Sequence, residues 1–370
     1  MRKFFTFTKR DAAVTFSKYG IALIAVMIIG ALLILAEGED PAYALEMILT
    51  GSLGSVTNIG NTIRWIIPCI MLGMSACIAF KSGVFNLGIE GQLYCGAFVA
   101  AVIGAKVLLP MGLHPIVCLL AAGVAGMLLA AIPALLKLFF GVNEMISTLM
   151  LNYVANIMTE FITLRMIEKA ATTPSNNIQT PNILETAELP SIIPNTYANI
   201  GIFIAIAVVV IVYLMYRYTI RGYEFKAVGE NLSFSKTNGV NIVGSYLAIF
   251  LLSGFVAGMA GGIEILGAHH HFTANFSKNL GWDGVMISMI AVNNPIGVSL
   301  VSVLWGILKS GSLNMERMTS LNRFTIILIQ ALFVLFVSID YRAVFDAISN
   351  KRKVRLENKK ERLMEEKHHV

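Results

Sequence analysis

Residues 107–136 read VLLPMGLHPIVCLLAAGVAGMLLAAIPALL and contain no Asp, Glu, Lys or Arg. A helix of roughly 20 residues is long enough to cross the hydrocarbon core of a bilayer, so this stretch could span a membrane once. A single run of this kind could also form a buried helix of a soluble protein. The rest of the chain decides between the two readings.

Further apolar runs recur along the chain, and its composition agrees with them. Of the 370 residues, 56% are hydrophobic and 14% are charged, and the mean hydropathy is +0.73. This is more apolar side chain than one soluble core could bury, so lipid must be the solvent. The sequence predicts an all-α, polytopic membrane protein with ten spans, near 20–36, 62–80, 84–105, 115–136, 145–165, 199–217, 243–267, 283–294, 296–311 and 323–340.

The basic residues orient these spans. A basic leader, residues 1–19, resembles the start of a signal peptide, but no small-residue cleavage pattern follows it, so the first span is expected to be retained. Most of the 28 Lys and Arg residues fall in segments that this assignment places inside, above all the leader, 218–242 and the charged tail 341–370. Both termini are therefore expected to be cytoplasmic.

The number of spans depends on residues 284–308. As one long helix they would give nine spans and place the basic tail outside, against the positive-inside rule. We expect two segments, broken near Asn293 and Asn294 where a proline follows. The acidic stretch 37–60 and the irregular, proline-containing loop 166–198 are expected to be external.

The two halves of the chain share a pattern. The second and seventh spans run in opposite directions, and each is followed by a polar segment with glycine, at 85–88 and 280–283. An inverted repeat, a recurrent transporter architecture, would explain this pattern. Chance similarity between apolar helices would explain it as well.

Motifs for several other functions are missing from the sequence. There is no G-x-x-x-x-G-K-[ST] loop to hold nucleotide phosphates, and no legible nucleophile with a base and an orienting carboxylate. The run 269–271 is three histidines, but neighbouring residues do not face one ion together and no cysteine or carboxylate cluster adjoins them. The four cysteines lie in or beside apolar runs, as small hydrophobic residues do. The sequence predicts no catalytic site and no metal site.

Polar residues inside apolar runs are the candidates for a substrate pathway. Glu90 lies nine residues beyond Lys81, which is roughly 13 Å into the membrane if the segment is helical. A carboxylate there either lines a cavity for a polar solute or is a paired residue that joins two helices. Asn293 and Asn294 are also expected near mid-depth. The expected pathway residues are Asn86, Glu90, Gln92, Asn152, Glu264, Asp283, Asn293 and Asn294.

For three of these residues a second explanation stays open. Asn152, Glu264 and Asp283 could each mark a helix end or an interhelical hydrogen bond instead.

Several short segments form a recognisable series. They are FNLGIEGQ at 85–92, GVNE at 141–144 with MLNY at 150–153, RGYE at 221–224 continuing to AVGEN at 227–231, LSG at 252–254 and NNP at 293–295. In this order they resemble the nucleoside-type permeases of ABC importers, relatives of the simple-sugar and branched-chain amino-acid permeases. The similarity covers residues 20–340. The chain departs from the family pattern at 291–292, which bears on substrate detail, and at Leu232 and 234–235, which bears on the fit to an ATPase.

The resemblance implies a type II importer permease in the cytoplasmic (inner) membrane of a bacterium, with a nucleoside as substrate. Its implied partners are a second homologous permease subunit, two cytoplasmic ATPase domains and an extracytoplasmic substrate-binding lipoprotein. No cofactor is expected on this chain, because ATP and magnesium would bind to the partner subunits. The basic residues flank spans instead of forming one stripe, so no nucleic-acid partner is expected.

The internal segment 218–242 is expected to couple the permease to its ATPase. It is similar to the family's docking segment, and a short helix at 230–238 would need a partner groove to be stable. A solvated linker would explain its charges equally well. The expected coupling residues are Arg221, Gly222, Glu224, Gly229, Glu230, Asn231, Phe234 and Gly239.

Other functions remain alternatives at this point. A permease for simple sugars belongs to the same superfamily. An ion-coupled secondary transporter would share the spans and broken helices but would work without an ATPase, and a membrane-embedded enzyme would need a polar catalytic cluster.

Overall fold

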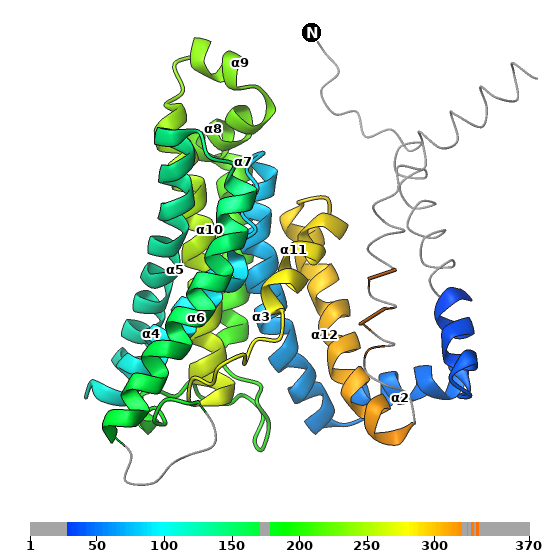
Figure 1. Ribbon diagram of the computed structural model, residues 1–370. Helices are drawn as coiled ribbons and strands as arrows, with labels where there is room; N and C mark the ends of the chain where they lie inside the picture. Colours follow the sequence, from blue (N-terminus) through cyan, green and yellow to red (C-terminus); the bar gives the residue numbers. More distant parts are fainter. Residues whose placement is uncertain (1–27, 171–177, 320–323, 325–326, 329–330, 333–370) are drawn as a thin grey trace, which may run out of the picture. The chain divides into compact units, whose positions relative to one another are not determined.

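The computed structural model describes residues 28–170, 178–319, 324, 327–328 and 331–332, and these are mostly helical (Figure 1). The chain divides into two units, Met1–Pro41 with Phe324–Val370, and Ala42–Arg323. In the first unit, residues 28–36 form a helix. The helices that follow are α2 (Pro41–Leu53), α3 (Val56–Lys81), α4 (Ile89–Lys106), α5 (Leu113–Phe140), α6 (Glu144–Ala170), η1 (Glu185–Ala187), α7 (Gly201–Tyr218), α8 (Ile220–Glu230), α9 (Leu232–Thr237), α10 (Ile242–Glu264), η2 (Ile265–His269), α11 (Leu280–Ile290) and α12 (Pro295–Met318).

Six helices of the described chain are long and apolar enough to cross a membrane. They are Val56–Lys81, Leu113–Phe140, Glu144–Met166, Gly201–Tyr218, Ile242–His269 and Pro295–Met318. This confirms the prediction of an all-helical integral membrane protein. Residues 20–27 of the span expected at 20–36 and most of the one at 323–340 lie outside the described residues, so ten spans and the inverted repeat stay predictions.

The break predicted before Pro295 is present. α11 ends at Ile290 and α12 begins at Pro295, and Asn294 caps α12 by accepting a hydrogen bond from the Ile296 amide. α11 has 11 residues, which corresponds to about 16 Å of helix, roughly half the thickness of the hydrocarbon core. It therefore enters the helix bundle without crossing it.

The acidic stretch 37–60, which is expected to be external, contains α2, whose first residue is a proline, a favoured position. Two predicted spans have a wrong N-terminal boundary. α3 begins at Val56 instead of 62, because Ser55 caps its first turn. α4 begins at Ile89 instead of 84, because residues 84–88 are irregular.

The predicted irregular loop at 166–198 begins later than expected. α6 continues to Ala170, and the described part from 178 onward contains one 3-10 turn, η1. This part is fixed by backbone hydrogen bonds, such as Thr180 N–H to Phe272 C=O and Leu189 N–H to Leu266 C=O. The described part of the loop, from 178 onward, thus forms an ordered cover over the chain that follows α10.

Helix α10 is the centre of the larger unit and packs against α3, α4 and α5 (Figure 1). Its glycines make this close packing possible. A Cβ at Gly258 would collide with the Ala122 carbonyl of α5, and a Cβ at Gly96 of α4 would collide with the Gly258 carbonyl. Small residues that let helix backbones touch are typical of helix packing in lipid.

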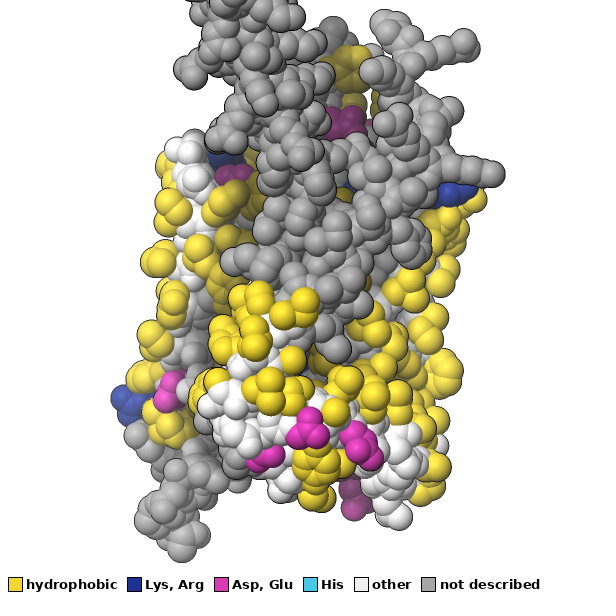
Figure 2. Space-filling model, turned by 90° about the vertical axis from the view of Figure 1, so that its right-hand side faces the viewer, with side chains coloured by type: hydrophobic (Ala, Val, Ile, Leu, Met, Phe, Trp, Pro, Cys, Tyr) yellow, Lys and Arg dark blue, Asp and Glu magenta, His cyan; other side chains and the backbone are white. Residues whose placement is uncertain are grey.

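The outer faces of the helices are apolar. On α5, the exposed residues Leu120, Val124, Leu128 and Ile132 are spaced by four and form one stripe. Figure 2 shows hydrophobic side chains over much of the described surface between its ends. Such a surface needs a lipid or protein neighbour.

Candidate functional site

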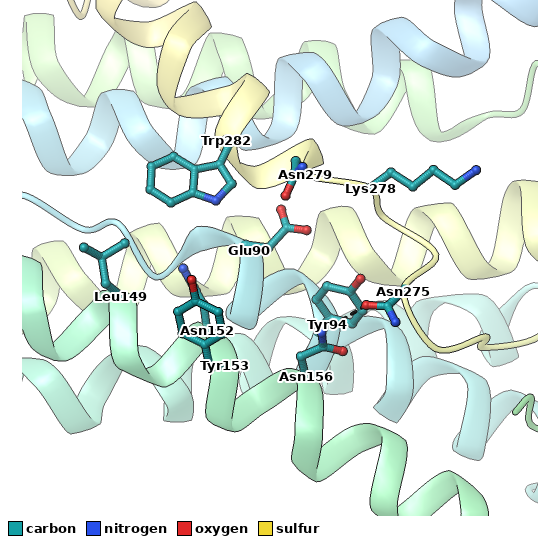
Figure 3. Close-up of a pocket in the computed structure, with 10 residues that line it drawn as sticks. All are labelled: Glu90, Tyr94, Leu149, Asn152, Tyr153, Asn156, Asn275, Lys278, Asn279 and Trp282. Atoms are coloured by element: carbon teal, nitrogen blue, oxygen red, sulfur yellow. Dashed lines mark hydrogen bonds between the residues drawn. The ribbon is translucent and has the colours of Figure 1, made fainter. Parts of the chain in front are cut away.

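A cavity of about 310 Å³ opens between α4, α6 and the chain that leads into α11 (Figure 3). Its wall combines amide, charged and aromatic side chains, with one leucine. Small-molecule sites are typically clefts of roughly this size or larger, with a few placed polar groups. The lining residues are Glu90, Tyr94, Leu149, Asn152, Tyr153, Asn156, Asn275, Lys278, Asn279 and Trp282.

Glu90 joins the start of α4 to the segment at the start of α11, beside this cavity. One carboxylate oxygen accepts a hydrogen bond from the Ser277 hydroxyl, and the other accepts one from the Gly281 amide at 2.5 Å. Glu90 lies in the first turn of α4, and Gly281 lies in the first turn of α11. The carboxylate therefore lies at the N-terminal ends of two helices, where the helix dipoles favour negative charge.

Gly281 is required for this arrangement. A Cβ at this position would lie 2.6 Å from both the Glu90 amide nitrogen and a Glu90 carboxylate oxygen, closer than real side chains approach. Because only glycine leaves this space open, α11 can begin directly against α4.

Asn152 supports the cavity from α6. Its side-chain nitrogen donates to the Leu87 carbonyl and its oxygen accepts from the Gly91 amide, each at 2.8 Å. The side chain thus replaces helical hydrogen bonds that the irregular chain before α4 does not make. It also lines the cavity, and its role in a substrate pathway stays a prediction.

Asn86 and Gln92 lie behind the cavity wall and are not among its lining residues. Their side-chain amides form a reciprocal pair with two hydrogen bonds of 3.0 Å. Asn86 also donates to the Ser253 hydroxyl of α10 at 2.9 Å. Both residues are almost completely buried. In the structure they connect the irregular segment before α4 to α10.

The structure places Asn293 beside the end of α3, and the expected mid-depth position of Asn293 and Asn294 stays a prediction. The Asn293 carbonyl accepts a hydrogen bond from the Lys81 ammonium at 3.1 Å, at the last residue of α3. α11 starts at the cavity beside Glu90, and its far end reaches the end of α3.

Glu264 is part of a buried charge cluster between α3 and α10. Its carboxylate pairs with Arg64 at 2.9 Å, and its side chain is 2% exposed. His269 Nε2 lies 3.1 Å from Arg64 Nη2 and 3.6 Å from the same Glu264 oxygen. The Arg64 guanidinium also lies 4.0 Å from the centre of the Trp65 ring. This geometry is an interhelical hydrogen bond, which was the second explanation of Glu264.

Asp283 pairs with Lys309 and thereby joins α11 to α12. The Lys309 ammonium lies 5.2 Å from the centre of the Trp65 ring, which also faces Arg64. Two of the three carboxylates that were expected in the pathway, Glu264 and Asp283, therefore have cationic partners. A paired charge avoids most of the cost of an isolated charge in an apolar region.

The predicted coupling residues lie on α8, on α9 and at the turns beside them. The short helix predicted at 230–238 corresponds to α9, and α8 is a further helix before it. Asn231 ends α8, and its side chain caps α9 by accepting a hydrogen bond from the Phe234 amide. Arg221 and Glu224 form an exposed ion pair at 3.0 Å. Gly239 has a positive φ of 74° in the turn after α9.

Two of the predicted coupling glycines are packing positions. A Cβ at Gly222 would collide with the Met215 carbonyl of α7, and a Cβ at Gly229 would collide with the Ser82 carbonyl after α3. They hold α8 against the ends of α7 and α3. Phe234 and Leu232, by contrast, are each 55% exposed on α9.

Several site residues were missed by the sequence reasoning. Arg64 and Lys309 are cations within apolar segments, a pattern that by itself suggests a functional or paired residue. Tyr94, Lys278 and Trp282 reach the cavity through the fold, and no sequence pattern marks them. Within the described residues, no group of three or more His, Cys, Asp or Glu side chains could hold a metal ion.

Comparisons with known proteins agree with the membrane fold. The sequence profile of a family described as "Branched-chain amino acid transport system / permease component" matches residues 58–337. The guanosine ABC transporter permease protein NupP of Bacillus subtilis (strain 168) is 32% identical over 331 residues, which are 88% of this chain and 93% of that protein.

Two further relatives carry different substrate names. The nucleoside ABC transporter permease protein NupB of Lactococcus lactis subsp. cremoris (strain MG1363) is 28% identical, over 80% of this chain and 84% of that protein. The glucose ABC transporter permease protein TsgB13 of Haloferax volcanii is 30% identical, over 86% of this chain and 85% of that protein.

The charge cluster gives a stability prediction. Glu264→Ala leaves the Arg64 guanidinium without its carboxylate, so we expect the subunit to lose about 3–5 kcal/mol of stability. Thermal unfolding of the purified subunit in detergent measures this loss as a lower Tm. The double variant Arg64→Met with Glu264→Met removes both charges and should recover most of it.

The exposed pair Arg221–Glu224 provides the matched control. Arg221→Ala should cost less than about 1 kcal/mol, because water compensates both charges there. An unchanged Tm for Glu264→Ala would show that the buried pair does not stabilise the contact between α3 and α10.

Proposed function

The chain belongs to the family of permease components of branched-chain amino acid transport systems, and on this premise we propose that it forms the translocation pathway of an ABC importer for nucleosides. The observation that carries the proposal is the polar cavity beside Glu90, at the start of both α4 and α11. Relatives named for guanosine and for nucleosides support the same substrate class.

The cavity suits the two halves of a nucleoside. Trp282, Tyr94 and Tyr153 offer aromatic faces against which a flat base can pack. Asn152, Asn156 and their neighbours offer amide groups that both donate and accept, as ribose hydroxyls and base edges require. Glu90 adds an acceptor for N–H or O–H donors. The predicted pathway residues remain part of this proposal, with Asn86 and Gln92 supporting the wall from behind.

A permease for simple sugars is the second candidate, because one relative is named for glucose. A sugar would use the same amide and carboxylate groups but would leave part of the aromatic surface without a flat partner. An ion-coupled carrier is the third alternative, and it differs in its energy source. Transport measurements distinguish all three.

The proposed importer contains further subunits. We infer a second homologous permease, two cytoplasmic ATPase domains and an extracytoplasmic substrate-binding lipoprotein, with ATP and magnesium bound to the partners. The chain itself would be a type II permease with ten helices and an inverted repeat, in the bacterial inner membrane. Its leader 1–19 and tail 341–370 would be cytoplasmic, 20–340 would form the membrane domain, and 166–198 would be external.

We also propose that 218–242 docks an ATPase. The segment forms α8 and α9 at the end of the helix bundle where α7 ends and α10 begins (Figure 1). Its glycines fix α8 to α3 and α7, and its exposed Leu232 and Phe234 present an apolar surface. A short helix with an apolar face is suited to a groove on a partner.

Reconstitution tests the proposed function. Liposomes with this chain and its ATPase, second permease and binding lipoprotein should take up labelled nucleosides when ATP is supplied. Excess unlabelled nucleoside should suppress the uptake, and excess glucose should not. Uptake by this chain alone, driven by a sodium or proton gradient, would contradict the ABC importer, and competition by glucose would favour the sugar permease.

Glu90 tests the role of the cavity. Glu90→Gln keeps the shape but removes the charge, so uptake should fall by about tenfold or more, as expected for losing a hydrogen bond to a charged group. The preference among different nucleosides should change as well. The exposed Glu185→Gln is the control and should leave uptake unchanged. Lower thermal stability with an unaltered nucleoside preference would assign Glu90 to helix packing alone.

Phe234 and Glu230 test the docking surface. Phe234→Asp and Glu230→Lys place a new charge at the proposed interface, so less ATPase should co-purify with the permease while membrane insertion stays normal. Tyr197→Asp, an equally exposed aromatic residue in the loop before α7, is the control. Full ATPase recovery with unchanged uptake in both variants would show that these residues do not dock the ATPase. The coupling site would then have to be sought in the turn around 137–144.

A further inference from the structure

Helix α11 connects the cavity to the end of α3. At its start, the Gly281 amide donates to Glu90 in the cavity wall. Just beyond its end, the Asn293 carbonyl accepts hydrogen bonds from the Lys81 ammonium at 3.1 Å and from the Cys77 thiol at 3.2 Å. One short helix therefore touches both the candidate substrate site and the terminus of a spanning helix.

Both ends of α11 are joints in an unusual backbone conformation. Before the helix, Lys278 and Asn279 have φ values of 47° and 73°; after it, Val292 and Asn293 have 51° and 54°. A β-branched residue such as valine is rarely found at positive φ. Backbone strain of this kind is typical of segments that switch between arrangements. α11 is thus a rigid rod between two strained joints.

Lys81 also contacts the chain that leads into the coupling segment 218–242. Its ammonium lies 5.5 Å from the centre of the Tyr216 ring of α7, and the Tyr216 hydroxyl donates to the Ile78 carbonyl at 2.7 Å. Directly after Lys81, the backbone at Ser82 and Gly83 touches Gly229 of α8 so closely that no Cβ fits between them. The end of α3 therefore contacts α7, α8 and the joint after α11.

We propose that Lys81 is a positioning residue that links the ATPase-docking segment, through α11, to the substrate cavity. This inference rests on the proposed function, because it assumes that 218–242 docks an ATPase. A displacement of α8 would move the end of α3 through Gly229, and Lys81 would pull on the joint at Asn293. α11 would then shift at its other end, where Gly281 holds Glu90.

The chemistry of Lys81 supports a specific role over simple packing. An ammonium group that is only partly exposed at a helix end is costly, and an uncharged residue of similar length would fill the same space. The ammonium adds a directional, charge-assisted hydrogen bond to a carbonyl in a strained turn. Such a bond transmits movement along one direction, which apolar contact does not.

The test compares transport with ATP hydrolysis in the reconstituted complex. Lys81→Met should leave the complex assembled but lower the number of nucleosides imported per ATP hydrolysed by about tenfold, a typical size for coupling between two sites. Lys81→Arg retains a charged donor and should recover part of this ratio. A role in packing alone would lower the amount of complex without changing the ratio.

Ser82→Ala is the matched control. It removes the 2.7 Å hydrogen bond between Ser82 and Tyr216 at the same end of α3 but does not touch Asn293, so the ratio should stay at the wild-type value. If Lys81→Met keeps the wild-type ratio, or if Ser82→Ala lowers it equally, the inference is wrong.

Val292→Gly tests the same joint without removing the hydrogen bond from the Lys81 ammonium to the Asn293 carbonyl. Val292 is 69% exposed, so folding should be unaffected, but glycine relaxes the positive φ and softens the joint. The import ratio should fall, and an unchanged ratio would overturn the inference even if Lys81→Met does not assemble. Failure of the wild-type complex to import nucleosides with ATP would instead contradict the proposed function.

Discussion

The close approach of backbones around α10 is the constraint on which the rest of the structure depends. Lipid offers helices no hydrophobic reason to associate, so their packing rests on direct contact and interhelical hydrogen bonds. Gly258 provides such contact with α5 and α4, and Ser253 adds hydrogen bonds to Ser75 of α3. Because α10 fixes three helices at once, the short irregular segments between them acquire defined positions.

The most important irregular segment is the chain before α4. Backbone groups at membrane depth must be satisfied inside the protein, because lipid offers them no partner. Asn86 and Asn152 supply these partners: the Asn86 side chain accepts from the Gly88 amide, and the Asn152 side chain donates to the Leu87 carbonyl and accepts from the Gly91 amide. Asn152 also brings α6 close to the start of α4, where a Cβ at Gly91 would lie 3.0 Å from the Asn152 Cα. The cavity opens beside this contact, and Asn152 lines it.

The sequence was sufficient for features that depend on composition and insufficient for those that depend on contacts between segments far apart in the chain. Uninterrupted apolar runs predicted α5 and α7 well, since length and hydropathy decide whether a helix spans a membrane. The position of Asn293 could not be predicted, because it depends on where α11 begins, which the contact between Gly281 and Glu90 determines. Arg64 lies within the span predicted at 62–80 but was missed, because its partner Glu264 is 200 residues away in the sequence and only the fold brings the two together.

The carboxylates in the helix bundle differ in their partners, and this difference distinguishes the two that join helices from the one at the candidate substrate site. Glu264 is neutralised by Arg64, and Asp283 is paired with Lys309. Glu90 is instead held by a hydroxyl, an amide and the ends of two helices, which orient its charge without neutralising it. A carboxylate oxygen has more than one acceptor position, so Glu90 can still accept a donor from a solute in the cavity. An ion pair at the same place would have stabilised the helices equally but would have left nothing for a substrate to bind.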